Sequence, residues 1–197
     1  MTGNPSKRYM LYLDNDPKDS FSPDKSWTIL SKARGLFDTK EIIIRDLRIA
    51  NKFLEFDISM SEQIDINDII ESMKNISSFK EIVKVEEHLD YDKEGLIKKA
   101  IILFNEEKYW WAHEKLENVW KKSFGDEKIL LNGIILIAAA FVHFQKDEND
   151  VCLSILNRAF NKLRNFEGKY YGIDIDRIND IVNNDILSKK KIFLFRI

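Results

Sequence analysis

The apolar residues of this chain change their spacing about half-way along it, and no other feature constrains the fold as strongly. Before about residue 92, short apolar runs alternate with polar residues, which is typical of β-strands. Beyond that point, apolar residues recur every three or four positions, which is typical of amphipathic helices. We therefore predict an α+β domain over residues 1–92 and an all-α domain over residues 93–188.

The first half contains elements in the order strand, helix, strand, strand, helix, strand. We predict them at residues 9–13, 27–37, from Ile42 onward, and at 53–59, 66–76 and 81–88. Asn51 and Lys52 are suited to the tight turn of a hairpin between the second and third strands. This order predicts a ferredoxin-like βαββαβ fold.

The strand at residues 53–59 argues against a nucleic-acid partner. Phe56 lies on its apolar face, whereas Glu55 and Asp57 are expected on the outer face. An RNA-binding sheet needs exposed aromatic and basic residues on such a face. The formal net charge of the whole chain is −2, which provides no field to attract nucleic acid. We therefore expect no nucleic-acid partner.

The second half predicts a five-helix bundle. Its helices are expected at residues 94–104, 109–120, 129–144, 150–166 and 174–187, and the short links between them favour antiparallel neighbours. Residues 189–197, KKKIFLFRI, form a basic and then apolar tail. The sequence leaves two alternatives open for this tail, which either docks on the first domain or is disordered.

Cysteine content and hydropathy predict a cytoplasmic protein. Cys152 is the single cysteine, so it forms no internal disulfide, and its apolar neighbours indicate a buried thiol. The first residues contain no apolar stretch of signal-peptide length. The apolar run from Ile129 to Phe144 is interrupted by Asn132, and it is shorter than the roughly 20 residues that span a bilayer. We expect no membrane partner.

The helix at residues 109–120 carries the candidate site. His113, Glu117 and Trp120 share one face with Leu116, because positions three, four and seven apart align on a helix. We predict that His113 and Glu117 converge with His143 of the next helix, and that Glu114 lies at the rim. Two imidazoles and a carboxylate can bind zinc, iron or manganese. Glu114 or Glu117 would then be the base in metal-assisted hydrolysis.

Two alternatives to a metal site remain open. The first is a metal-free ligand pocket, whose residues would be His113, Glu117, Trp120, His143, Trp111 and Arg158. In the second, Arg158 neutralises Glu117 and the cluster only fixes the register of the helices. The protein would then be a non-catalytic interaction or assembly module, which binds a protein partner by strand addition or forms a homo-oligomer.

The second half resembles domain-of-unknown-function family 309 in four blocks: LFNEEKYWWAHEKLENVW, LNGIILIAAAFVHF, LSILNRAFNKL and YYGIDIDRI. The hallmark of that family is a helix with the pattern H-x-x-x-E-x-x-W, which His113, Glu117 and Trp120 match. The resemblance covers residues 94–187 approximately, and it implies a compact helical domain without an assigned activity. Trp111 stands where the family commonly has an acidic residue, so no mechanism that needs a carboxylate there is implied.

Overall fold

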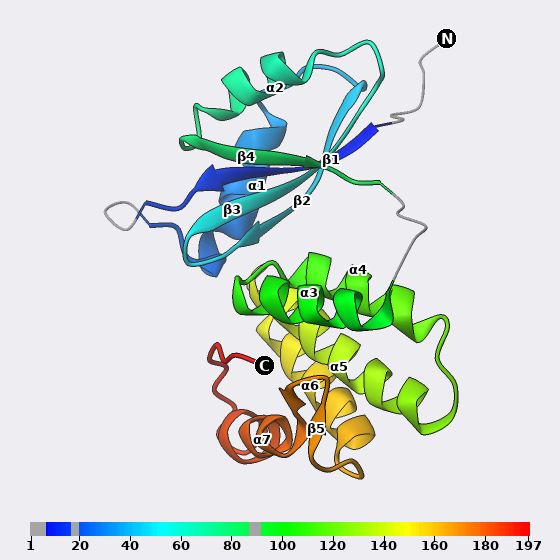
Figure 1. Cartoon of the computed structure of the whole chain (residues 1–197). Helices are drawn as coiled ribbons and strands as arrows, with labels where there is room; N and C mark the ends of the chain where they lie inside the picture. The colour runs from blue at the N-terminus through cyan, green and yellow to red at the C-terminus, as the bar shows by residue number, and fades with distance from the viewer. Residues whose placement is uncertain (1–6, 17–19, 87–91) are drawn as a thin grey trace. The chain divides into compact units, whose positions relative to one another are not determined.

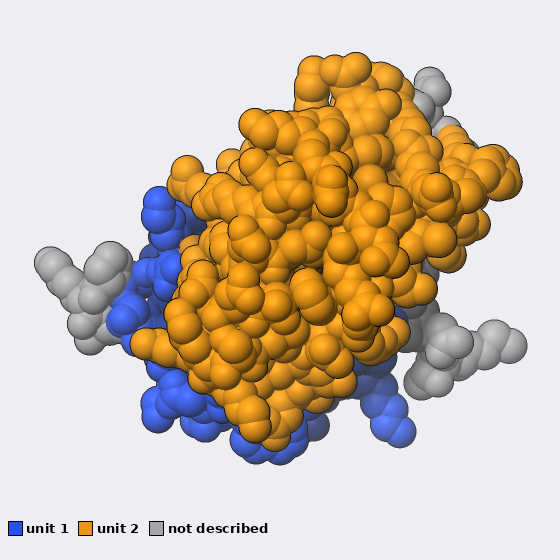
Figure 2. Space-filling view, turned by 90° about the horizontal axis from the view of Figure 1, so that it is seen from below, with its two compact units in different colours: residues 1–88, 145–147 blue, residues 89–144, 148–197 orange. Residues whose placement is uncertain are grey.

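The computed structural model describes residues 7–16, 20–86 and 92–197, and it divides the chain into two compact units (Figures 1 and 2). The first unit comprises residues 1–88 together with 145–147. The second comprises residues 89–144 and 148–197. Each unit is described separately below.

The first unit has the ferredoxin-like order that the sequence predicts. Its elements are β1 (Lys7–Asp14), a short 3₁₀ turn, η1 (Pro23–Lys25), α1 (Ser26–Arg34), β2 (Ile42–Ile49), β3 (Phe53–Met60), α2 (Ile66–Met73) and β4 (Phe79–Lys84). The strands form an antiparallel sheet in the order β2-β3-β1-β4, and Asn51 and Lys52 lie in the turn between β2 and β3. The last two residues of the predicted final strand, 87 and 88, lie outside the described residues.

The core of the first unit lies between the sheet and both helices. Leu54, Phe56 and Ile58 of β3 point into it, as their alternation predicts. Ile29 of α1 and Ile69 of α2 belong to the same buried cluster. One apolar face of the sheet therefore packs against both α1 and α2.

The expectation that Glu55 and Asp57 form an exposed outer face is wrong. Their exposed fractions are only 1% and 4%. Arg48 of β2 hydrogen-bonds Glu55, and Tyr12 donates its hydroxyl to Glu55 Oε2 at 2.5 Å. Arg8 of β1 donates to both oxygens of Asp57, at 2.9 and 2.6 Å. These carboxylates tolerate burial because arginines of neighbouring strands pair with them. Burial by itself would lower the pKa of Arg48, but Glu55 and the nearby aspartates raise it.

The second unit is the predicted helical bundle, with small additions. Its elements are α3 (Lys93–Asn105), α4 (Tyr109–Trp120), α5 (Gly125–Phe144), α6 (Asn149–Leu163), the two-residue strands β5 (Lys169–Tyr170) and β6 (Ile173–Asp174), α7 (Ile175–Asp180) and η2 (Ile181–Leu187). The fifth predicted helix is thus divided into α7 and the π-helical segment η2. Helix α5 begins at Gly125, earlier than the predicted Ile129.

Helix α5 runs through the centre of this bundle. By length and composition alone it could cross a membrane, because its most apolar window has a mean hydropathy of 1.7. Half of that window is buried inside the protein, and Leu131, Ile134 and Phe141 belong to the bundle core. Core helices of soluble proteins pass the same test of length and composition.

The tail docks on the helical unit, which neither alternative from the sequence anticipated. Phe195 is 9% exposed, and its ring centroid lies 5.4 Å from that of Phe141 and 6.0 Å from that of Phe104. The Asn105 side chain donates to the carbonyl of Ile197 at 3.1 Å and accepts from its N–H at 3.0 Å. These contacts hold residues of the tail in the same core as α3 and α5.

Candidate functional site

Buried residues of α4 fix the rotation of the helix that carries the candidate site. Tyr109, Ala112, Leu116 and Val119 recur at spacings of three and four and are all buried. The Tyr109 ring stacks on Phe141 of α5, with centroids 5.1 Å apart. Burial raises the pKa of Tyr109 far above its ordinary value, so the phenol stays neutral. This buried stripe places the neighbouring positions of α4 at the edge of the bundle.

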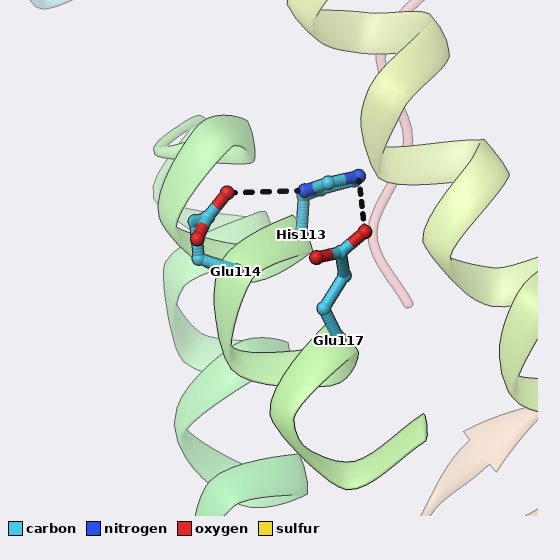
Figure 3. A group of neighbouring side chains, drawn as sticks. All are labelled: His113, Glu114 and Glu117. Carbon is cyan, nitrogen blue, oxygen red and sulfur yellow. Dashed lines mark ion pairs between the residues drawn. The ribbon is translucent and has the colours of Figure 1, made fainter. Parts of the chain in front are cut away.

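His113 lies between two carboxylates at that edge (Figure 3). Its Nδ1 lies 3.6 Å from Glu114 Oε1, and its Nε2 lies 3.7 Å from Glu117 Oε1. Both distances exceed the usual length of a hydrogen bond. The side chains are 25% exposed for His113, 41% for Glu114 and 34% for Glu117. The predicted site thus lies at the bundle surface, within reach of solvent, rather than inside the core.

The three residues can each offer one ligand atom to the same metal ion. These ligand atoms all lie within 4.8 Å of one another. The sequence placed Glu114 only at the rim, because adjacent residues of a helix point in different directions. The structure brings it to the group because the Glu114 carboxylate approaches the opposite nitrogen of the imidazole from the one that faces Glu117.

His143 is not a member of this group among the described residues. Its Nδ1 makes a close contact with Glu148 Oε2, across the turn between α5 and α6. The predicted convergence of His143 with His113 and Glu117 is therefore not found. The partner of His143 is thus Glu148, five residues further along the chain, and not a residue of α4.

The prediction that Arg158 neutralises the carboxylate of Glu117 is not met in the structure. Arg158 is exposed on α6, whereas Lys121 Nζ lies 3.8 Å from Glu117 Oε2. Lys121 follows Glu117 by four residues, which is the spacing at which opposite charges on one helix meet. A lysine at the C-terminal end of α4 thus takes the place that the sequence assigned to Arg158 of another helix.

The two predicted tryptophans of the ligand pocket are partly covered by lysines. Trp111 is half-buried and meets Trp110 edge to face at 4.9 Å, and Lys115 Nζ lies 5.8 Å from its ring centroid. Lys128 Nζ lies 4.5 Å from the ring centroid of Trp120. Such contacts between a cation and an aromatic face are attractive. Burial, and then Lys99, lower the pKa of Lys115.

A small hollow does lie on α4, away from the predicted pocket residues. Its volume is about 70 Å³, and its lining consists of Lys93, Leu96, Asn118, Val119, Lys122 and Ser123. The predicted ligand-pocket residues do not line it.

A comparison with protein-family models finds one match within the helical unit. The family model described as Domain of unknown function (DUF309) matches residues 97–154. This segment resembles DUF309. The DUF309 match runs from within α3 to within α6, and it contains all three residues of the His113 group. The match confirms the family resemblance seen in the sequence, but it covers a shorter segment than residues 94–187. No curated protein matches the chain, and no solved structure does.

Proposed function

We propose that the helical unit binds a divalent metal ion through His113 Nε2 and Glu117 Oε1. The observation that carries this proposal is the 3.7 Å separation of the two atoms. Two ligands of a tetrahedral zinc ion, at bond lengths of about 2.0–2.1 Å, lie roughly 3.4 Å apart. The pair is too long for a hydrogen bond and needs to contract by only a few tenths of an ångström to hold a metal.

Glu114 would hold the His113 imidazole in the neutral tautomer that leaves Nε2 able to bind a metal. A histidine that binds metal through Nε2 carries its proton on Nδ1 and donates it to a second group. Glu114 Oε1, at 3.6 Å from Nδ1, is the nearest carboxylate described there and would accept that hydrogen bond after a small rotation. This arrangement favours the neutral imidazole as a ligand and raises its basicity.

One nitrogen and one oxygen ligand suit zinc, iron or manganese, and they leave coordination positions open. Water or a substrate would occupy those positions, because all three side chains are partly exposed. A bound water would become acidic enough for metal-assisted hydrolysis. Glu117 would then serve as a ligand, and Glu114 would hold the imidazole from the opposite side of the ring.

A non-catalytic interaction module remains the second candidate, and one observation favours it. Lys121 already lies 3.8 Å from Glu117, so the carboxylate is paired without a metal. In that case the His113 group only orders the surface of α4, and partner binding takes place elsewhere.

Metal content of the untagged full-length protein, prepared without chelator, separates these candidates. We expect near-stoichiometric zinc, iron or manganese, and a loss of affinity of at least roughly tenfold in both His113→Ala and Glu117→Gln. His143→Ala is the matched control, since His143 also pairs with a glutamate, and it should keep its metal. Metal-free protein, or equal metal in all variants, would reject the metal site and favour the interaction module.

A further inference from the structure

A hollow of about 490 Å³ lies on the first unit, beside the edge strand β2. The end of α1 and the loop that follows it meet the first residues of β2 there. Figure 1 labels α1 and β2. Its lining consists of Arg34, Phe37, Thr39, Lys40, Ile42, Ile43 and Ile44. All of these residues belong to one unit, so the hollow is a feature of that unit alone.

The hollow presents apolar side chains to solvent. Ile43 is 42% exposed, and Phe37 and Ile42 are half-buried. Apolar side chains exposed side by side in a hollow often mark a binding site. The volume lies within the usual range of about 300–1,000 Å³ for small-molecule sites.

Both charged residues of the lining are cations, and none of the described lining residues carries a carboxylate. Arg34 is held in place, because its Nε donates to the Ile44 carbonyl at 2.9 Å and its Nη2 to the Arg45 carbonyl at 3.0 Å. The remaining N–H groups of the guanidinium stay available, since this side chain has five. A cation whose position is already fixed binds an anion at a smaller entropic cost.

The same hydrogen bonds disfavour a partner that adds as a β-strand. Arg34 occupies backbone carbonyls of Ile44 and Arg45, and the pairing of β2 is irregular between Ile44 and Asp46. Capping by a charged side chain and a bulge are two ways in which proteins protect an edge strand. An extended peptide would have to displace Arg34 from these two carbonyls to pair along the middle of β2, so a small molecule fits this hollow better.

We propose that this hollow binds small amphipathic carboxylates. The aliphatic body of the ligand packs against Phe37, Ile42 and Ile43, and its carboxylate pairs with Arg34 and Lys40. Thr39 accepts a hydrogen bond from the Glu41 N–H at 3.1 Å, which leaves the hydroxyl hydrogen of Thr39 to donate to the same anion. This assignment does not depend on the metal site of the helical unit.

Decanoate titrated into the full-length protein, followed by backbone amide resonances, tests the proposal. We expect saturable shifts confined to residues 34–44. Lys40→Glu and Ile43→Asp should each weaken binding by roughly tenfold, the effect of losing about 1.4 kcal/mol. Lys52→Glu and Ile102→Asp are matched controls, because an exposed lysine and an exposed isoleucine are changed elsewhere, and both should bind decanoate as before.

Three results would overturn the proposal. If decanol binds as tightly as decanoate, then Arg34 and Lys40 do not recognise the carboxylate. A lack of saturable decanoate binding, or an equal loss of affinity in the control variants, would remove the site itself. An apolar peptide that shifts the β2 resonances where decanoate does not would replace the small molecule with a partner strand.

Discussion

Gly133 of α5 faces Leu163 of α6 so closely that a Cβ on Gly133 would lie 2.5 Å from the leucine Cδ2. The glycine therefore sets how near the two helices approach at the centre of the bundle. A larger residue requires the leucine to move within a close-packed core, where little free volume exists.

Gly133→Ala should lower the free energy of unfolding by about 1–3 kcal/mol, as overpacking of a core usually does. Urea unfolding measures this change. Gly35→Ala is the matched control, because its added Cβ would meet carbonyl oxygens at 3.5 and 3.6 Å and its φ is −71°. It should leave stability unchanged or slightly increased. Leu163→Ala combined with Gly133→Ala should cost less than the sum of the single changes, and strict additivity would show that the two residues do not clash.

Phe195→Ala should destabilise the helical unit by about 3 kcal/mol, because its ring is 9% exposed and contacts the rings of Phe104 and Phe141. The midpoint of guanidinium unfolding reports the loss. Phe193→Ala, two residues earlier and 38% exposed, is the control and should change stability by less than about 0.5 kcal/mol. Equal effects in the two variants would mean that the tail does not dock through Phe195.

The Cys152 thiol should resist modification in the folded protein. Burial raises the pKa of this thiol to about 12, so at pH 8 roughly one molecule in ten thousand carries the thiolate. We expect no reaction with a disulfide reagent at pH 8 until denaturant is added. Val151→Cys, introduced together with Cys152→Ala, is the matched control, since position 151 is 43% exposed and should react at once. Rapid modification of native Cys152 would contradict its burial.

Glu127 should make stability fall in acid. A hydrogen bond from Lys93, and a weaker one from Tyr170, lower the pKa of Glu127 below its ordinary 4.5, although burial acts the other way. A carboxyl whose pKa is lower in the folded state stabilises the protein above the unfolded pKa, and this contribution disappears as the pH falls through the folded pKa. Unfolding free energies measured from pH 6 to pH 3 should fall less steeply in Glu127→Gln than in the native protein. Exposed Glu167→Gln should keep the native slope.

Local patterns predicted the elements of the fold, but not what covers each face. Alternation in β3 separates Phe56 from Glu55 correctly. It does not reveal that Glu55 is buried, because its partner Arg48 comes from a neighbouring strand and the pairing depends on the register between them. Asp57 and its partner Arg8 are 49 residues apart, and no pattern within a single strand joins them.

The candidate site follows the same division between local and distant contacts. His113 and Glu117 are four residues apart on one helix, so their sequence spacing alone brings them together. Convergence with His143 or Arg158 depends on how separate helices rotate and slide against each other, which spacing does not determine. In the structure, each residue pairs with a group close to it in sequence. His143 pairs with Glu148, and Glu117 pairs with Lys121.

The docked tail decides where the chain can be shortened. The DUF309 match ends at residue 154, part-way along α6, whereas Leu163 and Phe195 complete the packing around α5. A recombinant fragment cut at the ends of the match would expose Phe104 and Phe141 and leave α6 without its second half. Such a fragment should aggregate during expression, so an assay of the matched segment alone would report on its solubility before it reported on any function.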